Sequence, residues 1–357
     1  MRIGLLIYGD LNSISGGYLY NRQLLAYLRG KGDEVIVMSW PVRPLWQQLG
    51  DNFRQDCLRQ LADAKLDILI QDGMVQPSVF LLNRRLRFRV VTLLHLLASY
   101  DQQPRFRAWF YRAIERLYLR SVTGIIANSQ TTLTQVSHIL DKPLPAHCVA
   151  VPAGNHFPLA SPDTHAICLR ALAAGPLNIL VVGNVIRRKG LHVLLAALSL
   201  LPEENLHVTV AGRLDMEPDY VSQIKHQIHA AGLQNRVCLK GPVQGQALVA
   251  LYQQHHLMVL PSAYESYGIV YVEAQQFGLP VIGTTGGAAR EIIAQGDNGY
   301  LIAPEDSRSL AAILQNLHHD RALLVQLSQR ALAAYARHPS WEESCARIWD
   351  YCHQWAV

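Results

Sequence analysis

The sequence contains no long hydrophobic run. Half of its 357 residues are hydrophobic, but no apolar run reaches the roughly 18 residues that a membrane-spanning helix needs. The first ten residues, MRIGLLIYGD, contain too short an apolar run for a signal peptide and are better interpreted as a first β-strand. These features predict a folded protein of the cytoplasm.

The sequence also lacks the residue spacings of a disulfide framework or a metal site. Its six cysteines are scattered and include no C-x-x-C pair, which is typical of buried free thiols. Its 15 histidines include no H-E-x-x-H arrangement. Among the histidine pairs only His318 and His319 have an acid beside them, Asp320. We therefore predict that the protein binds no metal.

The glycine-rich loop after the first strand candidate lacks the two common nucleotide motifs. GDLNSISGGY (9–18) is neither a G-x-G-x-x-G turn nor a Walker A loop, which disfavours dinucleotide binding and ATP hydrolysis. Gly16 and Gly17 at the expected start of a helix nevertheless resemble a turn that allows a phosphate to approach the backbone. This loop is therefore a candidate phosphate contact.

Positive charge is concentrated in the first half of the chain. Residues 1–165 contain 18 Lys and Arg against 12 Asp and Glu, a net charge of +6, whereas the remainder contains 14 against 15, a net charge of −1. A basic first half indicates an anionic ligand, an acidic acceptor or a membrane surface, and a solvated basic face is the alternative. No feature predicts a nucleic-acid partner.

Short apolar, β-branched runs alternate with segments of helical periodicity along the chain. The segments 17–30 and 109–121 are examples of the predicted helices. This alternation predicts right-handed βαβ units and parallel sheets, and hence an α/β fold. The strand candidates are 2–8, 34–40, 67–73, 89–95, 124–129 and 148–154 in the first half, and 177–183, 206–212, 236–241, 257–262, 280–284 and 299–303 in the second.

The alternation breaks once, in a proline-rich segment. Between Pro152 and Pro176 there are four prolines, two glycines and little strand signal, which predicts an interdomain linker with an irregular or short helical part. We therefore predict two doubly wound domains, residues 1–165 and 166–337. The last segment, 338–357, is predicted to be a helix that crosses back to the first domain.

The carboxyl ends of the predicted strands are the expected place for a ligand. Open parallel sheets bind ligands there, and two such sheets that face each other would form a cleft lined by strand-to-helix loops. In the loop SAYESYGIVYVE (262–273), Gly268 stands where a helix begins, and free backbone N–H groups at a helix start favour an anion. Glu265 precedes this point and Glu273 follows it, so the two carboxylates could bind separate hydroxyl groups of one ligand. The alternative is that Glu265 caps the helix and Glu273 is a surface residue.

Three other strand ends carry polar or flexible residues. VVGNVIRRKG (181–190) ends with three consecutive cations, which suit a diphosphate. TTGGAAREII (284–293) places two glycines after a strand as a possible backbone-donor loop. His95 ends a strand in the basic half and could bind a substrate hydroxyl, although a lone histidine among leucines is commonly a core residue.

Together these segments resemble the family 4 glycosyltransferases, the retaining enzymes of glycosyl transferases group 1 that have the two-domain GT-B fold. PSAYESYGIVYVEAQQFGLPVIGTTGGAAREII is similar to the core motif of that family, and VVGNVIRRKG to its basic phosphate-binding loop. SGGY, the strand that ends at His95, IIANS and VPAGNHF match landmarks of the first domain more loosely. The resemblance implies two Rossmann-like domains that face each other across a cleft.

The resemblance also implies residue roles. Glu273 would bind the ribose of a nucleotide sugar, Glu265 the transferred sugar, and Arg188 and Lys189 the diphosphate. The catalytic residues would be Glu265 and His95. His95 would face the sugar. The backbone N–H groups of Tyr267, Gly268 and Ile269 would assist at the diphosphate. Gly16 and Gly17 would approach the phosphates.

Two residues depart from the family pattern. Asn155 in VPAGNHF stands where the family usually has aspartate, and the other departure is Asn184. The family often has arginine directly after the glycine that matches Gly183, where this sequence has Asn184. Arg187 or Arg188 would then take over the contact with the diphosphate.

The implied activity is that of a hexosyltransferase, which moves a sugar from a nucleotide-sugar donor to an acceptor hydroxyl with retention and without a cofactor. A UDP-sugar is favoured and a GDP-sugar is the alternative. No Asp-x-Asp metal-nucleotide signature is present, and cations with helix N-termini can stabilise a departing diphosphate without a metal. The alternative functions are those of a GT-B epimerase or phosphorylase, or of an inactive sugar-nucleotide-binding protein.

The acceptor is undefined and includes small molecules, glycans and lipid-linked sugars. RFRAWFYRAIERLYLR (105–120) carries five arginines and one glutamate among aromatic residues, and RRLRFR (84–89) adds four arginines. These segments could place the protein at the inner face of a membrane. The alternative, a helix that packs on the sheet with solvated arginines, is the favoured interpretation.

Overall fold

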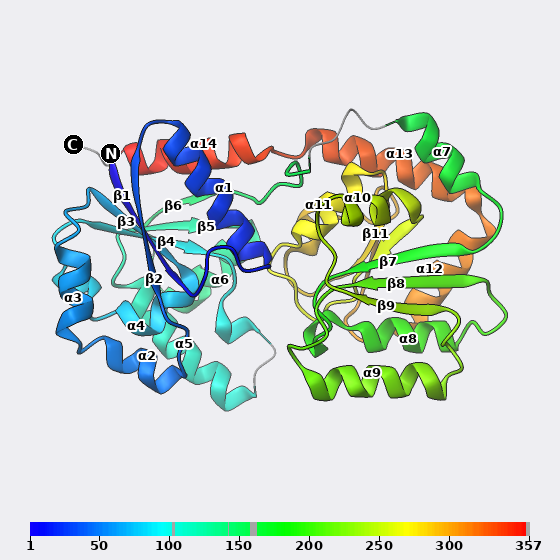
Figure 1. Cartoon of the computed structure of the whole chain (residues 1–357), viewed down its shortest axis with the longest axis horizontal. Coiled ribbons are helices and arrows are strands. Elements are labelled where there is room, and N and C mark those ends of the chain that lie inside the picture. Colours follow the sequence, from blue (N-terminus) through cyan, green and yellow to red (C-terminus); the bar gives the residue numbers. More distant parts are fainter. Residues whose placement is uncertain (102–103, 142, 158–162, 355–357) are drawn as a thin grey trace. The chain divides into compact units, whose positions relative to one another are not determined.

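The computed structural model describes residues 1–101, 104–141, 143–157 and 163–354 and divides the chain into two compact units (Figure 1). Unit 1 consists of Met1–Pro152 and Pro339–Val357, and unit 2 of Ala153–His338. The domain boundary was predicted at 165/166, whereas the contacts divide the chain at 152/153. Residues 158–162 of the proline-rich segment and 355–357 of the last segment lie outside the described residues.

Unit 1 is built on a six-stranded parallel sheet in the order β2-β1-β3-β4-β5-β6. Strands β1, β3 and β5 are buried along nearly their whole length, as expected for a parallel sheet that is covered by helices on both sides. The strands are β1 (Arg2–Tyr8), β2 (Glu34–Trp40), β3 (Ile68–Asp72), β4 (Arg89–Leu94), β5 (Gly124–Ala127) and β6 (Ala146–Val149).

Helices cover both faces of this sheet. Figure 1 shows α1 and α14 on one side, where they pack together, and α2, α4 and α5 on the other. The C-terminal helix is fixed to unit 1 by Trp349, whose indole N–H donates to Asp33 at 2.9 Å, and by Tyr351, whose hydroxyl donates to the Ala146 carbonyl at 2.7 Å. The helices are α1 (Gly16–Gly30), α2 (Leu45–Asp51), α3 (Gln55–Ala62), α4 (Gln76–Val79), α5 (Arg105–Leu119), α6 (Gln130–Leu140) and α14 (Trp341–His353).

Unit 2 is built on a second six-stranded parallel sheet, in the order β12-β11-β10-β7-β8-β9. Its strands are β7 (Leu177–Val182), β8 (Leu206–Ala211), β9 (Val237–Gly241), β10 (Leu257–Val259), β11 (Val281–Thr284) and β12 (Gly299–Ile302). Its helices are α7 (Thr164–Leu172), α8 (Leu191–Ser199), α9 (Pro218–Ala230), α10 (Gly245–Gln254), α11 (Ile269–Gln276), α12 (Ser307–His319) and α13 (Arg321–Arg337).

The predicted α/β class of two doubly wound sheets is confirmed, and every strand candidate overlaps a strand of the structure. The largest difference is β6, which ends at Val149 instead of continuing through the predicted 148–154. Pro152 cannot donate to a strand ladder, so the apolar run leaves the sheet as it approaches that residue. Among the described residues, no helix is both long enough and apolar enough to cross a bilayer.

Candidate functional site

Glu265 lies in the loop between β10 and α11 of unit 2, and it is buried although it is charged. Only 7% of the residue is exposed. The Lys189 ammonium donates to its carboxylate at 2.5 Å, and the Ser262 hydroxyl donates at 3.3 Å. Burial alone would raise the pKa of Glu265, but the positive charges of Lys189 and Arg188 outweigh burial and lower it. The carboxylate is therefore ionised at neutral pH and is compensated by cations from another loop.

That other loop follows β7 and contains the cationic run. A 3-10 turn at Arg187–Lys189 ends at Gly190, which has a φ of 72° and lies so close to the backbone of Pro261 that a Cβ would meet its carbonyl oxygen at 2.0 Å. The Arg188 guanidinium donates to the Tyr264 carbonyl at 3.0 Å, and the Ala263 N–H donates to the Arg188 carbonyl at 2.8 Å. The close glycine contact thus places Arg188 and Lys189 beside Glu265.

Arg187 has a different environment from its two neighbours. It is exposed, its guanidinium donates to Gln223 of α9 at 2.7 Å, and it stacks over the Tyr220 ring at 5.3 Å. The Asn184 side chain accepts from the Arg213 N–H at 3.3 Å. Arg187 and Arg188 were the two candidates to replace an arginine at position 184. Only Arg188 lies beside Glu265.

Helix α11 begins at Gly268 with a backbone that favours glycine. Gly268 has a φ of 102°, and a Cβ there would meet the Tyr271 ring at 2.4 Å. No side chain caps the helix, so Glu265 is not its cap. Within the described chain, the N–H groups of Ile269 and Val270 donate to no protein group. These groups and the helix dipole make this end of α11 suited to an anion.

Tyr267, the residue before this glycine, contributes its backbone to the same turn, but its side chain is directed elsewhere. The side chain is buried, and its hydroxyl lies 2.6 Å from His338 Nε2 at the end of unit 2. The phenol therefore has a structural partner within unit 2.

Glu273 lies inside α11 and is 5% exposed, so the alternative reading of it as a surface residue is wrong. The Tyr252 hydroxyl donates to its carboxyl group at 2.6 Å, and His156 Nε2 lies 3.5 Å from the other oxygen. Gly154 packs on the backbone of the same turn, where a Cβ would come within 3.1 Å of the Glu273 nitrogen. Burial raises the pKa of Glu273 to about 7, and the hydrogen bond from Tyr252 only partly offsets this effect.

The two glycines after β11 support the loop of Glu265. A Cβ on Gly286 would meet the Ala263 carbonyl oxygen at 2.2 Å, and one on Gly287 would meet that of Glu265 at 2.1 Å. The Glu265 N–H donates to the Gly286 carbonyl at 3.0 Å, and the Ala288 N–H donates to the Glu265 carbonyl at 2.8 Å. The glycines thus fix the backbone that carries this carboxylate.

In unit 1, Gly16 and Gly17 begin α1, and the Ser15 hydroxyl caps that helix by accepting from the Tyr18 N–H at 3.3 Å. His95 directly follows β4, and a Cβ on Gly17 would lie 3.3 Å from the His95 ring. Strands β1, β3 and β4 are neighbours, so their carboxyl ends place these residues together. The structure therefore groups the three sequence-predicted residues of this unit.

Two further residues hold the His95 ring. Asn21 Nδ2 donates to the Asp72 carboxylate at 2.6 Å, so its Oδ1 is the atom that lies 3.4 Å from His95 Nε2. An amide oxygen only accepts, so Nε2 carries the proton. Burial lowers the pKa of His95, although Asp72, 3.6 Å away, acts in the opposite direction. The neutral ring then presents Nδ1 as a hydrogen-bond acceptor, which suits a hydroxyl group.

Sequence reasoning missed Asp72 and Asn21 in unit 1 and Tyr252 and His156 in unit 2. A signal existed for Asp72, which ends a strand as His95 does. A signal also existed for His156, which lies in the landmark segment VPAGNHF. None existed for Asn21 and Tyr252, because they lie within helices and reach the site only through the fold. The described residues include no group of three or more His, Cys, Asp or Glu side chains arranged to bind a metal.

Solved structures share the fold over essentially the whole chain. Sucrose-phosphate synthase from Thermosynechococcus elongatus matches with a TM-score of 0.82 at 20% identity, over 99% of this chain and 98% of that chain. Anabaena HepE, solved with UDP and glucose, matches with a TM-score of 0.77 at 20% identity, over 98% of both chains. The protein is therefore a two-domain α/β protein of the GT-B fold class.

Sequence matches are concentrated in unit 2. Residues 171–334 match the family model described as Glycosyl transferases group 1. The D-inositol 3-phosphate glycosyltransferase of Xylanimonas cellulosilytica is 32% identical over 196 residues, which are 54% of this chain and 46% of that protein. That of Corynebacterium glutamicum is 27% identical over 246 residues, which are 66% and 58% of the two chains. The matches span about half the length of these curated relatives. Most of unit 2 is therefore similar to the glycosyl transferases group 1 family.

Proposed function

We propose that the protein is a retaining glycosyltransferase that moves a hexosyl group from a UDP-sugar to an acceptor hydroxyl without a metal ion. One observation carries this proposal: the buried carboxylate of Glu265 is paired with Lys189 at 2.5 Å immediately before the N-terminus of α11. A carboxylate that can bind a sugar thus lies next to cations and backbone N–H groups that can bind a diphosphate.

The cations stabilise the leaving group. When the sugar–phosphate bond breaks, negative charge develops on the departing UDP, and fixed positive groups lower the energy of that state. An ammonium group has three donors, so Lys189 can hold Glu265 and a phosphate oxygen at the same time. Arg188 and the N–H group of Ile269 add further positive potential at this point. These groups supply what a metal ion supplies in other transferases.

The carboxylates bind the two sugars of the donor. Glu265 accepts from hydroxyl groups of the transferred sugar, and Glu273, further along α11, accepts from the ribose hydroxyls. Because burial raises the pKa of Glu273 to about 7, its acceptor capacity depends on pH near neutrality. In unit 1, His95 Nδ1 accepts from a substrate hydroxyl, and the backbone at Gly16 and Gly17 approaches a phosphate.

The anomeric configuration of the sugar is retained because the displacement occurs in a single step on one face of the sugar. The bond between the anomeric carbon and the phosphate oxygen breaks, and a bond to the acceptor oxygen forms on the same face. The acceptor proton passes to the departing phosphate oxygen. A double displacement would need a nucleophilic carboxylate at the anomeric carbon. Glu265 is held by Lys189 and Ser262, which suits it to positioning.

The choice of donor is supported by a protein of the same fold, and glycosyl transfer is supported by relatives in sequence. HepE was solved with UDP-glucose and matches this chain with a TM-score of 0.76, and the curated relatives are named as glycosyltransferases of D-inositol 3-phosphate. The HepE complex supports a UDP-sugar donor, and the names of the relatives support glycosyl transfer.

Calorimetric titration with UDP, GDP, ADP and CMP, followed by the matching sugar nucleotides, tests the proposal. We expect UDP to bind and Lys189→Ala to weaken binding, whereas Lys225→Ala, an exposed lysine on α9, leaves it unchanged. UDP-sugar turnover should persist in EDTA, and NMR of the product should show the donor's anomeric configuration. Absence of binding to every nucleotide would refute the donor site. Binding without turnover would favour an inactive sugar-nucleotide-binding protein.

A further inference from the structure

Helix α5 of unit 1 presents an apolar stripe to solvent. Phe106 and Trp109 are 78% and 67% exposed, although residues of this type are normally buried. The exposed residues recur at intervals of three and four, which places them on one face of the helix. The opposite face packs on the unit through buried Ile114, Tyr118 and Leu119. The stripe consists of Phe106, Trp109, Phe110, Ala113 and Leu117.

Among the described residues of α5 and Arg120, which follows it, every exposed charged side chain is positive. Arg107 and Arg112 lie on opposite sides of the stripe, since successive residues turn by about 100° around a helix. The one acidic residue, Glu115, is buried and accepts from the Ser99 N–H at 3.1 Å and from its hydroxyl. The acid of this helix is thus used inside unit 1, and its outer face is apolar and cationic.

Two of the arginines also have partners on the neighbouring element. Arg112 donates to the His138 carbonyl of α6 at 2.6 Å, and Arg116 pairs with Asp141 after the same helix. These contacts fix α5 against α6 and leave Arg107 and Arg120 as exposed cations at the two ends of the helix. The orientation of the apolar stripe is therefore set by the fold.

A second set of arginines lies at the end of the sheet where α5 ends. The Thr123 N–H donates to the Val90 carbonyl at 2.8 Å, which places the segment after α5 beside the start of β4. The segment before β4 exposes Arg84, Arg85 and Arg87, and Arg89 at the start of β4 is also exposed. Cationic groups therefore extend beyond the helix in the direction of its C-terminus.

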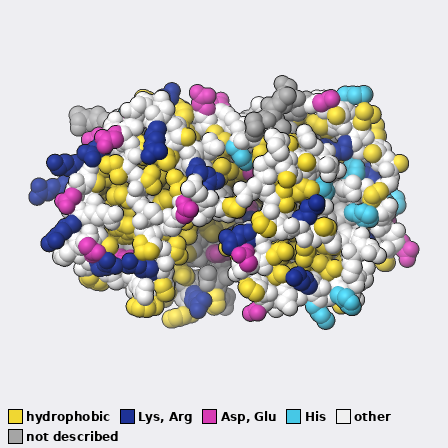
Figure 2. Space-filling view, in the orientation of Figure 1, with side chains coloured by type: hydrophobic (Ala, Val, Ile, Leu, Met, Phe, Trp, Pro, Cys, Tyr) yellow, Lys and Arg dark blue, Asp and Glu magenta, His cyan; other side chains and the backbone are white. Residues whose placement is uncertain are grey.

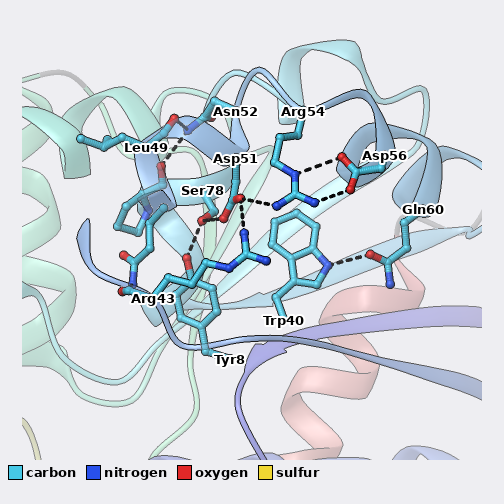
Figure 3. Close-up of polar contacts among 12 residues, drawn as sticks. Tyr8, Trp40, Arg43, Leu49, Asp51, Asn52, Arg54, Asp56, Gln60 and Ser78 are labelled. Carbon is cyan, nitrogen blue, oxygen red and sulfur yellow. Dashed lines mark hydrogen bonds and ion pairs between the residues drawn. The ribbon is translucent and has the colours of Figure 1, made fainter. Parts of the chain in front are cut away.

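Helix α2 adds aromatic residues to the same side of unit 1. Helix α4 contacts both α2 and α5, and Trp46 of α2 and Phe53 after it are exposed. The position of α2 is fixed because Asp51 accepts from Ser78 of α4 at 2.9 Å and from Arg43 at 2.9 Å (Figure 3). Figure 2 shows hydrophobic and basic side chains together along the lower edge of unit 1, where Figure 1 draws α2 and α5.

From this arrangement we infer that α5 docks unit 1 on the surface of an anionic lipid bilayer. A helix with an aromatic stripe between arginines can lie in the plane of the interface, with its rings in the acyl boundary and its guanidinium groups at the phosphates. The bilayer is favoured over other partners because the charge of the outer face has one sign, which complements the negative surface of such a membrane. This inference is independent of the proposed glycosyl transfer.

Vesicle co-sedimentation tests the inference with the intact chain. We expect binding to phosphatidylcholine vesicles that contain about 30% phosphatidylglycerol, and weaker binding in about 0.5 M NaCl because salt screens the attraction. Phe106→Ser combined with Trp109→Ser should lower the partition coefficient by about tenfold or more, since two large side chains no longer enter the apolar phase. Arg107→Gln combined with Arg120→Gln should lower it for the anionic vesicles only.

The matched control lies in unit 2, where Leu169 and Leu172 of α7 are also exposed. Leu169→Ser combined with Leu172→Ser removes apolar side chains of similar exposure and should leave partitioning unchanged. The unfolding midpoint and UDP binding of each variant report whether it remains folded. In a direct measurement, brominated lipids should quench tryptophan emission in the wild type, and Trp109→Phe should reduce the quenching while binding persists.

Several results would overturn the inference. They are absence of sedimentation with anionic vesicles, equal binding to neutral vesicles, and wild-type partitioning by the Phe106/Trp109 variant. Sedimentation velocity tests the other occupant, a second copy of the chain. If the same two substitutions dissociated a dimer and did not affect vesicle binding, the stripe would be an interface between copies.

Discussion

The two units hold their candidate residues by different physical means. In unit 2, Glu265 and Lys189 form a buried ion pair, with Arg188 beside them. In unit 1, His95 is held by the Asn21 amide, which is in turn held by Asp72. The first arrangement offers charge to a charged ligand, and the second fixes the tautomer of a neutral ring. Under the proposed function, this difference assigns the charged groups of unit 2 to the diphosphate and His95 of unit 1 to a hydroxyl group.

Activity should fall most when the ion pair between Glu265 and Lys189 in unit 2 is broken. Lys189→Ala should lower kcat/KM for the UDP-sugar by about 100-fold or more, the scale observed when one preorganised donor to a developing anion is removed. It should also destabilise the unit by about 3 kcal/mol, because it leaves the Glu265 carboxylate buried without its partner. Steady-state kinetics and denaturant unfolding measure the two effects.

A second variant separates catalysis from stability at this pair. Lys189→Ala combined with Glu265→Gln removes both charges, so much of the lost stability should return while activity stays low. If the double variant regained activity, Lys189 would act only by neutralising Glu265.

Substitutions around His95 in unit 1 should lower activity less, and they should also change its dependence on pH. Asp72→Asn removes the carboxylate that orients Asn21, so the His95 tautomer is no longer fixed, and we expect kcat/KM to fall by about tenfold. Because Asp72 raises the pKa of His95, the substitution should also lower that pKa and shift the acid limb of the pH–rate profile to lower pH.

Asp51→Asn is the matched control for this prediction. Asp51 is another buried carboxylate of unit 1, but it pairs with Arg43 and Ser78 (Figure 3). The control should reduce stability and leave the pH–rate profile in place. An unchanged profile in Asp72→Asn would show that Asp72 has only a structural role.

The strands and the donor side of the site could be predicted from the sequence because both are local properties. Short, mostly apolar runs define the buried parallel strands. Gly268 and the cationic loop lie within a few residues of the strand ends that position them. Side chains brought together by tertiary structure could not be predicted in this way. The Tyr252–Glu273 hydrogen bond joins α10 to α11, and Asn21 reaches Asp72 across 51 residues of sequence.

The ionisation of Glu273 should control the affinity of unit 2 for UDP. Burial raises the pKa of Glu273 to about 7, so the carboxyl group is largely protonated at pH 6 and largely ionised at pH 8. The ionised group accepts hydrogen bonds from both ribose hydroxyls, so UDP affinity should rise by up to about tenfold between these pH values. Calorimetry should show this rise in the wild type and a flat profile in Glu273→Gln.

The stability of the protein should vary with pH in the opposite direction. The unfolded carboxyl group loses its proton near its ordinary pKa of 4.5, whereas the folded group keeps it until about pH 7. The folded state therefore binds more protons in this interval, and the free energy of unfolding falls as pH rises through it. Glu273→Gln should remove this fall, and Glu291→Gln, an exposed control, should retain it. A wild-type slope in Glu273→Gln would assign the dependence to another group.

Substitution of Arg187 in the cationic loop should have little effect on activity. Arg187 and Arg188 are adjacent in sequence, but Arg187 is exposed and directed to Gln223 and Tyr220 of α9. Arg187→Ala should therefore change the KM for the UDP-sugar by less than about twofold, as expected for an exposed cation outside the site. Arg188→Ala should raise it more, since that guanidinium lies beside Glu265 and lowers its pKa. Equal effects of the two substitutions would mean that the loop acts through its total charge, and the assignment of the diphosphate contact to Arg188 would be lost.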